Sequence, residues 1–254
     1  MSGSATIQVC HVLREDRDLA EAVDPAHREQ AIEECTAREL TIPTGRWSSL
    51  QATRVPGGLG LLVLRGVMIR RVGISGRHGA ELLGECDVLR PWQPENESLL
   101  PLTTSWWVLE PAHLAVLDDQ FARLLARYPE LAGRLFARAV ERSRNLAINM
   151  AIVHQARVDV RLHMLLWHLA GRWGRVRSDG TVLPLRLTHT VLADLVAARR
   201  PTVTTALSEL SRRGLVRSLD DRWVLYGEPP RAMLEMSSGP WRGDATAGPT
   251  ARRA

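Results

Sequence analysis

The chain has 254 residues, of which 45% are hydrophobic, and a formal net charge of +5 at pH 7, which fits one large domain or two small ones with apolar cores. Three scattered cysteines, Cys10, Cys35 and Cys86, are too few for a zinc or iron–sulfur site, so we expect no metal and no other cofactor. No apolar run approaches about 18 residues, and the first residues do not resemble a signal peptide, so we expect a cytoplasmic protein without membrane contact.

The first 40 residues form the predicted N-terminal helical segment. Asp24-Pro25 is typical of an N-cap followed by a first-turn proline, and it predicts a charged helix that runs to about Glu39. Residues 41–128 differ, because short runs of β-favouring residues alternate there with glycine and proline. This pattern predicts a compact antiparallel β-roll, and hence a chain of the α+β class. The runs are Arg46–Thr53, Leu59–Val72 and Thr104–Leu109.

A helical region is predicted from His113 to about Gln155, with one long dimerisation helix at residues 129–158. Small and apolar residues recur in it every seven positions, with a second series between them, which is a heptad pattern. A helix of this length connects domains or forms a dimer seam, and packing on its own domain is the alternative. The predicted dimer interface consists of Leu135, Ala139, Arg142, Leu146, Asn149 and Val153.

Residues 159–228 are predicted to form a separate C-terminal domain. The tail at residues 229–254 is predicted to be disordered, because it is rich in Pro, Gly, Ser and Arg. Asp159 is placed to cap a helix, a turn at Ser178-Asp179-Gly180 leads into a strand, and Asp220-Asp221 joins two strands of a hairpin. The helix is expected at residues 160–172, and the strands at residues 182–187, 215–219 and 222–226.

Two short helices lie within LTHTVLADLVAARRPTVTTALSELSRRGLV, residues 187–216. Thr188 is placed to cap the first, Pro201 fits the first turn of the second, and Gly214 fits the position after its last turn. The break at residues 197–199 is too short for the helices to lie antiparallel. Each helix has one apolar face, formed by Val191, Leu192, Leu195 and Val196 in the first and by Val203, Ala206, Leu207 and Leu210 in the second.

The opposite face of the second helix is small and hydrogen-bonding, with arginine at both ends. All 33 basic residues of the chain are arginine; its guanidinium binds phosphate bidentately, although GC-rich codon usage gives the same bias. Hydroxyl groups fit the base edges of DNA and arginines fit phosphate or guanine, so we predict a winged helix-turn-helix that binds DNA; a winged helix used only for protein contacts is the alternative. The predicted DNA contacts are Thr188, His189, Thr190, Arg199, Arg200, Pro201, Thr202, Thr204, Thr205, Ser208 and Arg212.

From about residue 159 to residue 227 the sequence resembles the C-terminal domain of the Crp–Fnr superfamily of bacterial transcription regulators. The resemblance rests on the Thr-capped helix, on Arg-x-Thr-Val-x-x-Ala-Leu-x-x-Leu and on Arg-Gly-Leu-Val. Upstream, a cyclic-nucleotide-binding-like β-roll and one long helix match the family's effector domain and dimer helix. The resemblance implies a sequence-specific transcription regulator that binds double-stranded DNA as a homodimer, with its second helix in the major groove and RNA polymerase as a further partner.

The family's DNA-contacting residues carry over only in part. Arg200 matches an arginine that reads guanine in many members, Thr202 matches a phosphate contact, and residues 188–190 match the phosphate contacts of the first helix. Pro201 replaces a glutamate and Thr205 replaces a second arginine, and both of these read bases in many members. The resemblance therefore implies a two-fold operator with a different half-site sequence.

The effector site departs from the family as well. In cyclic-nucleotide-binding members, a cassette that begins with Gly-Glu ends in an arginine followed by Ser or Thr, which binds the cyclic phosphate. Here Arg90 precedes Pro91, and Glu95 and Glu97 would repel a phosphate, so cyclic AMP is not expected to bind in the family's mode. The candidate effector residues are Glu81, Glu85, Arg90 and Asn149.

Two function classes follow from these patterns. The first is a transcription regulator controlled by a ligand or partner at the β-roll, and the second is an effector-independent scaffold that binds DNA or protein. His78, His113 and Cys86 are candidates for a haem ligand by residue type only. No catalytic spacing is present, so the chain is not expected to be an enzyme.

Overall fold

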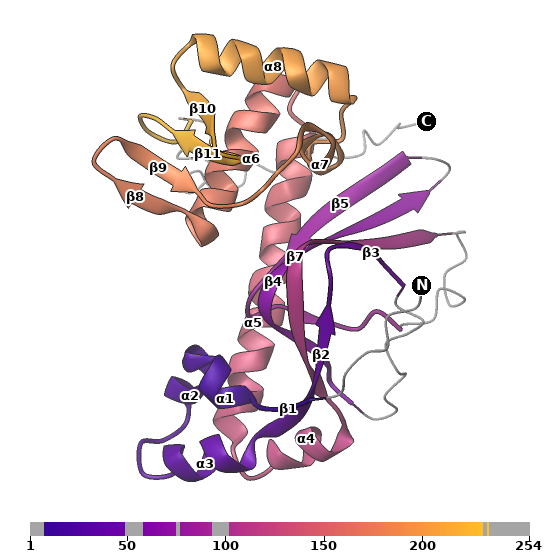
Figure 1. The fold of residues 1–254 in the computed structure, drawn as a ribbon, viewed down its shortest axis with the longest axis vertical. Helices are drawn as coiled ribbons and strands as arrows, with labels where there is room; N and C mark the ends of the chain where they lie inside the picture. The colour runs from indigo at the N-terminus through magenta and orange to yellow at the C-terminus, as the bar shows by residue number, and fades with distance from the viewer. Residues whose placement is uncertain (1–7, 49–57, 75–76, 93–101, 231–232, 234–254) are drawn as a thin grey trace, which may run out of the picture.

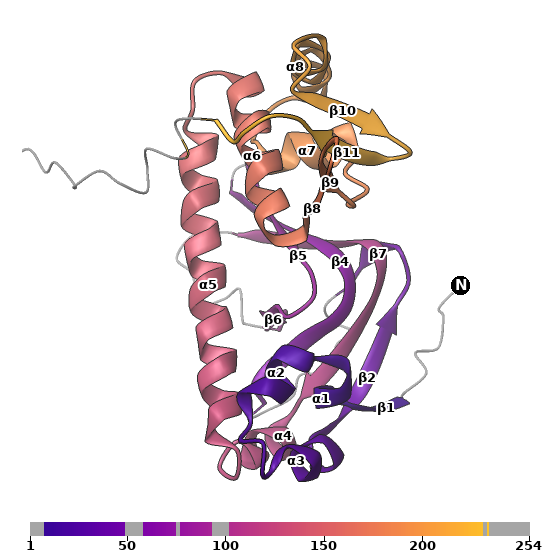
Figure 2. The same ribbon diagram turned by 90° about the vertical axis from the view of Figure 1, so that its left-hand side faces the viewer.

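The computed structural model describes residues 8–48, 58–74, 77–92, 102–230 and 233. The molecule has three parts: a β-roll, a long helix beside it, and a helix-turn-helix domain (Figure 1). A β-roll with small helices at its lower end lies along a single long helix, α5 (Pro129–Val153), and a helix-turn-helix domain lies at the upper end of both (Figures 1 and 2). The tail predicted to be disordered lies outside the described residues, apart from residues 229, 230 and 233.

The N-terminal part contains two strands as well as helices. β1 (Gln8–His11) pairs antiparallel with β2 (Thr36–Ile42). Between them lie α1 (Val12–Glu15), α2 (Arg17–Ala22) and α3 (Arg28–Glu34). The predicted helix through Glu39 is wrong beyond Glu34, because residues 38–42 pair with a distant strand instead. The Asp24 carboxylate accepts the N–H of Ala26 in a turn and does not cap α3.

One antiparallel sheet forms the roll, which confirms the predicted fold class. It contains β3 (Gly45–Trp47), β4 (Gly60–Ile74), β5 (Arg77–Leu83), β6 (Val88–Leu89) and β7 (Thr103–Leu117). The strand order is β1-β2-β7-β4-β5, with β3 on β7 and β6 on β4. The helix predicted from His113 is wrong at its start, because residues 113–117 pair with β2 and β4 as part of β7.

The two long strands β4 and β7 bend where their register shifts between Val63 and Met68. Gly66 lies in this bend with φ +97°, and a Cβ there would meet the Pro111 carbonyl oxygen at 2.4 Å. Glycine is therefore required for the close approach of the two strands. Trp47 and Trp106 lie on the inner face, where their rings make an edge-on contact at 5.6 Å.

The long helix α5 follows the short α4 (Asp119–Leu124) and has two different faces. Its inner face packs on the roll through Leu131 and Leu135. On the opposite face Phe136, Val140 and Met150 are 71%, 52% and 63% exposed. This outer apolar row is exposed, with no other part of the described chain packed over it.

The helix-turn-helix domain begins with α6 (Val158–Trp173), two residues earlier than predicted. Asp159 lies inside the first turn and pairs with Arg157 at 2.8 Å, so it is not the cap. A four-stranded sheet, ordered β10-β11-β9-β8, forms the wing. The strands are β8 (Arg175–Arg177), which the sequence analysis missed, β9 (Gly180–Leu183), and the predicted hairpin of β10 (Val216–Leu219) and β11 (Arg222–Leu225).

The roll and the helix-turn-helix domain share one apolar core. Val67, Ile69 and Leu82 of the roll belong to the same buried cluster as the leucines of α6 and of α7 (His189–Leu195). Arg71 of β4 pairs with Asp194 of α7, and Arg172 of α6 pairs with Asp87 at 2.9 Å. Both views show α7 directly above β5 (Figures 1 and 2), so the two domains are held by apolar and ionic contacts together.

Candidate nucleic-acid interface

A short turn joins α7 to α8, which spans Arg200–Arg212. Hydrogen bonds between residues that are close in the sequence define this turn. Thr188 caps α7 as predicted, because its hydroxyl accepts the N–H of Val191 at 3.3 Å. Ala197, two residues after the end of α7, has a φ of +51° in the left-handed region, and the N–H of Ala198 donates to the Ala193 carbonyl at 2.9 Å. This tight turn sets the angle between α7 and α8.

The second helix is anchored by the four predicted apolar residues, all of them buried: Val203, Ala206, Leu207 and Leu210. It ends as predicted at Gly214, where φ is +69°. The N–H of Gly214 donates to the Ser211 carbonyl at 2.9 Å, and that of Leu215 donates to the Leu210 carbonyl at 3.0 Å. Both bonds together form a Schellman motif, which leads the chain directly into the wing.

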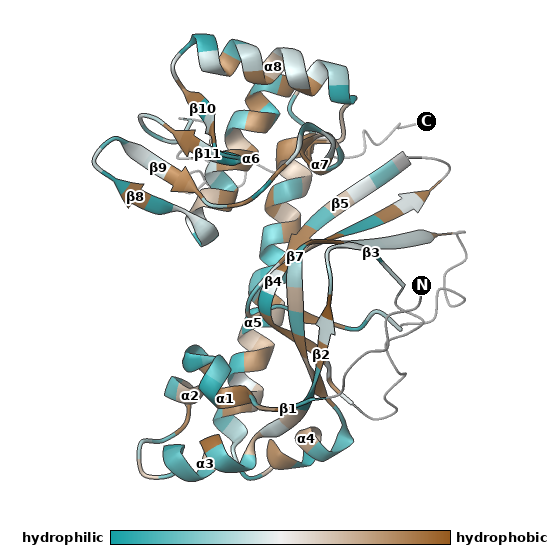
Figure 3. Ribbon diagram, in the orientation of Figure 1, coloured by the Kyte–Doolittle hydropathy of each residue, from teal (hydrophilic) through white to brown (hydrophobic). Residues whose placement is uncertain are grey.

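The outward face of α8 carries the predicted small polar residues. It is pale to teal in the hydropathy view (Figure 3). Thr204, Thr205 and Ser208 are exposed, and each hydroxyl donates to the carbonyl four residues earlier, at 3.2, 3.2 and 3.0 Å. Because the hydroxyl protons are used internally, the oxygens remain free as acceptors. This face can therefore accept hydrogen bonds from a ligand.

Arginines at the two ends of α8 differ in their pairing. Arg199, which is the N-cap residue, and Arg200 are exposed, and neither has a carboxylate partner in the described part of the chain. Arg212 is engaged, because Glu209 accepts from its guanidinium at 2.8 to 3.0 Å. The free cations therefore lie at the N-terminal end of the helix, where the helix dipole also favours anions.

His189 and Trp223 connect the two helices to the wing. His189 Nδ1 lies 2.9 Å from Thr204 Oγ1, and the His189 ring lies 6.3 Å from that of Trp223. Trp223 Nε1 donates to the Leu187 carbonyl at 3.2 Å. The β10–β11 hairpin of the wing adds two exposed arginines, Arg217 and Arg222, which the sequence analysis did not single out although the alternation of the hairpin places them there.

The candidate effector residues come together only in part. Glu81 is buried and accepts hydrogen bonds from Arg142 at 2.6 and 3.0 Å, and it also pairs with Arg70 at 2.8 Å. Asn149 donates to the Ala80 carbonyl at 3.3 Å. The cavity beside Glu81, Arg142 and Asn149 measures about 60 Å³. Burial raises the pKa of Asp87 in its wall, against the lowering effect of Arg172.

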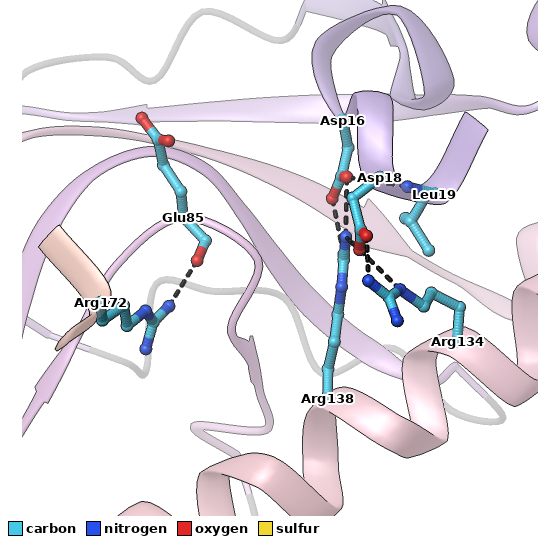
Figure 4. Close-up of polar contacts among 7 residues, drawn as sticks. All are labelled: Asp16, Asp18, Leu19, Glu85, Arg134, Arg138 and Arg172. Atoms are coloured by element: carbon cyan, nitrogen blue, oxygen red, sulfur yellow. Dashed lines mark hydrogen bonds and ion pairs between the residues drawn. The ribbon is translucent and has the colours of Figure 1, made fainter. Parts of the chain in front are cut away.

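The other two candidate effector residues lie elsewhere. Arg90 is exposed and lies beside Gly60. Glu85 directs its carboxylate away from the helices, and only its backbone carbonyl accepts from Arg172 (Figure 4). Glu95 and Glu97 lie outside the described residues.

Part of the predicted dimer interface is used within the chain. Leu135 packs on the N-terminal helices, while Arg142 and Asn149 bond to Glu81 and Ala80 of β5. Leu146 and Val153 are half-buried, and Ala139 is exposed. Nearby, Arg138 forms a two-pronged ion pair with buried Asp16 at 2.6 and 2.7 Å, and Arg134 pairs with Asp18 (Figure 4). The arginines of α5 thus hold the roll to the helix.

The residues suggested by type for haem do not gather. His113 pairs with Glu39 at 2.5 Å, His78 is exposed, and burial raises the pKa of the Cys86 thiol. In the described ranges there is no group of three side chains that could hold a metal ion. No helix in the same ranges has both the length and the apolar character needed to cross a membrane.

Comparison with known proteins agrees with this architecture. Residues 160–226 match the family model described as a Crp-like helix-turn-helix domain. A "CRP-like cAMP-activated global transcriptional regulator" of Mycobacterium tuberculosis is 26% identical over 222 residues, which cover 84% of this chain and 93% of that protein.

Solved structures share the fold at lower identity. A CooA variant from Carboxydothermus hydrogenoformans has a TM-score of 0.59 at 16% identity, over 80% of this chain and 88% of that one. The "c-di-GMP Responsive Global Regulator CLP" of Xanthomonas campestris has a TM-score of 0.54 at 16% identity, over 81% of this chain and all of that one. Residues 160–226 therefore form a Crp-like helix-turn-helix domain, and the whole chain, with its β-roll and long helix, is similar to Crp-like transcription regulators.

Proposed function

We propose that the protein binds a specific two-fold operator as a homodimer, with α8 in the major groove. The observation that carries this proposal is the surface of α8: four buried anchors hold the helix, and a row of hydroxyl acceptors ends at Arg199 and Arg200, which have no carboxylate partner in the described chain. A helix that only stabilised the fold would not need free guanidinium groups at an exposed end. Base edges and phosphates of the major groove supply the matching donors and anions.

Individual contacts follow from this geometry. Arg200 at the leading end of α8 reads a guanine, and Thr205 and Ser208 accept from amino groups of adenine or cytosine. Arg199, Thr202, Thr204 and residues 188–190 contact the backbone, and Pro201 fills space without a polar contact. Arg212 reaches phosphate only if it leaves Glu209, because the two are paired in the free protein. The half-site therefore differs from the one that a second arginine would select.

The dimer is proposed to form through the outer apolar row of α5. The predicted seam and this row share the same seven-residue period, but the row lies one position later along the helix, at Phe136, Val140 and Met150, with exposed Ala147 between the last two. Leu135, Arg142 and Asn149 contact the roll of their own chain. We therefore retain Ala139 at the edge of the seam and assign its centre to Phe136 and Val140.

Cyclic AMP is not the proposed effector, although the Mycobacterium tuberculosis relative is described as cAMP-activated. Cavities of about 60, 470 and 320 Å³ adjoin one another where the roll meets α5, and the larger two fall within the roughly 300–1,000 Å³ of small-ligand pockets, so the state of the arginines, and not the volume, speaks against cyclic AMP. Arg142 and Arg172, the two arginines that line the smallest of these cavities, are each held in an ion pair, with Glu81 and Asp87 respectively. Effector-independent DNA binding is the alternative, and the same pairing of Arg142 and Arg172 with carboxylates supports it. We further propose that regulation acts through RNA polymerase, that the protein is cytoplasmic and that it catalyses no reaction.

The test combines selection of bound sequences from random DNA with the variant Arg200→Ala. Selection should return a two-fold site, and Arg200→Ala should weaken the best site by about ten- to hundredfold and relax preference at one base pair per half-site. Arg123→Ala on α4, at the far end of the roll, is the matched control and should bind like the wild type. If Arg200→Ala keeps its melting temperature and its full base preference, direct readout by Arg200 is excluded.

A further inference from the structure

A wide groove separates the roll from the helix-turn-helix domain on the side of the proposed DNA contacts. Its volume is about 740 Å³, larger than each of the three cavities beside α5. One wall consists of Thr188, His189, Thr190 and Arg200, all of them proposed to contact DNA. The other wall belongs to the roll. DNA seated on α7 and α8 would therefore pass beside the roll.

The roll's wall is formed where β3 pairs with β7. Arg46 lies directly opposite Trp107 in the antiparallel register, so both side chains lie on the same face of the sheet. Trp106 and Trp47, on the other face, are buried at 5% and 8% exposure. Trp107 is 45% exposed and lines the groove together with Thr44 and Gly45. We call Thr44, Gly45, Arg46 and Trp107 the roll lip.

The same face of the sheet continues under the helix-turn-helix domain. Ile69 pairs with Leu82 on one side and with Trp107 on the other, and both aliphatic residues are buried in the core shared with α6 and α7. Across the strands, the row thus changes from buried Leu82 and Ile69 to half-exposed Trp107 and exposed Arg46. The lip is held rigidly next to the domain, because the packed half of the row fixes its position.

The arginines that line the groove lie on the helix-turn-helix wall, and Arg46 adds a positive charge at the edge of the roll, on the same face of the sheet as Trp107. Arg46 is exposed and has no ion-pair partner among the described residues. Arg186 and Arg200 line the opposite wall, and Asp221 at the tip of the wing is the one carboxylate that also lines the groove. An arginine without a partner beside an exposed tryptophan fits a phosphate and its sugar, since guanidinium binds phosphate and the indole ring packs on apolar sugar atoms.

We infer that the roll lip binds the phosphate backbone of DNA flanking the half-site, as a second DNA contact outside the helix-turn-helix. This inference rests on the proposed function, because it requires a duplex on α7 and α8. The contact reads no sequence; it lengthens the footprint of each subunit on the DNA and adds phosphate contacts to the binding energy.

The experiment uses the full chain and two duplexes that contain the selected operator. The short duplex ends at the outer base pair of each half-site, and the long duplex extends one helical turn, about 10 base pairs, on each side. The wild type should bind the long duplex more tightly. Arg46→Ala should weaken binding to the long duplex roughly three- to tenfold and lower its salt dependence by about two ions per dimer, with no change on the short duplex.

Two further variants separate charge from folding. Arg46→Lys should recover most of the lost affinity, because it retains the charge, and Arg46→Glu should weaken the long duplex further. Arg123→Ala should not differ from the wild type on either duplex. Equal binding of both duplexes by the wild type, or an Arg46→Ala protein with unchanged affinity and salt slope on the long duplex, overturns the lip contact alone. A wild type that binds neither duplex contradicts the proposed function instead.

Discussion

At the scale of single residues, the turn of the helix-turn-helix contains a strained alanine. Ala197 is held at φ +51° after the last turn of α7, and an L-residue there costs roughly 1–2 kcal/mol. Glycine removes this cost but gains freedom in the unfolded chain, worth about 0.4–1 kcal/mol. Ala197→Gly should therefore raise the free energy of unfolding by up to about 1 kcal/mol, measured by thermal or urea unfolding.

The neighbouring Ala198 provides the matched control. Its φ is not in the left-handed region, so Ala198→Gly adds only entropy to the unfolded chain and should destabilise the protein. If both glycine variants lose stability equally, the strain assigned to Ala197 is absent.

A second prediction at this scale concerns acid stability. The pKa of Asp18 is lowered to about 2, first because Arg134 donates hydrogen bonds to its carboxylate, with Arg138 contributing as well. A carboxyl whose folded pKa lies below its unfolded value of about 3.9 stabilises the folded state above that value and loses the contribution as the pH falls toward 2. Asp18→Asn should therefore make the decline in unfolding free energy between pH 4 and pH 2 shallower than in the wild type. Parallel curves for the two proteins would contradict this role.

At the scale of elements, the helix-turn-helix was predictable because its signals are local. The Thr188 cap, the four-residue anchor of α8 and Gly214 lie within 30 residues of one another. Residues 36–39 and 113–117 were predicted as helix and are strands, because Arg38 and Glu39 pair with Val116 and Ala115, over 70 positions away. Such pairing leaves little trace in local periodicity. The same limit hid the lip, whose Arg46 and Trp107 meet across 61 positions.

The dimer seam shows where periodicity stops being informative. A heptad pattern gives the spacing of a face but not which of two adjacent faces is free. The face that packs on the roll is fixed by Glu81, which lies 61 positions before Arg142 and binds its guanidinium. The period was therefore readable from the sequence, while the rotation of the helix required the position of β5.

This assignment makes a test at the element scale possible. Phe136→Glu combined with Val140→Glu places charges at the centre of the proposed seam and should give monomers in sedimentation that bind half-sites only weakly. Ala137→Glu, exposed on the flank of α5, is the matched control and should remain dimeric. A dimeric double variant would place the interface elsewhere on the molecule.

At the scale of the whole molecule, the shared core joins the roll and the helix-turn-helix domain into one unit. Ile69 and Leu82 are buried among residues of α6 and α7, and the Arg71–Asp194 and Arg172–Asp87 pairs bridge the same junction. Domains that are joined by a shared buried cluster and by ion pairs unfold together. Calorimetry should therefore show one transition for the full chain, and two separated transitions would contradict a shared core.

The outer row of α5 also has a consequence for gene dosage. If the chain must dimerise before it can bind a two-fold site, the occupancy of that site depends on the concentration of the chain. Below the dissociation constant of the pair, the amount of paired protein grows with the square of the chain concentration, so a twofold rise in synthesis gives about a fourfold rise in occupied sites. Phe136 and Val140 then set the expression level at which regulated genes respond, without contacting DNA or any small molecule.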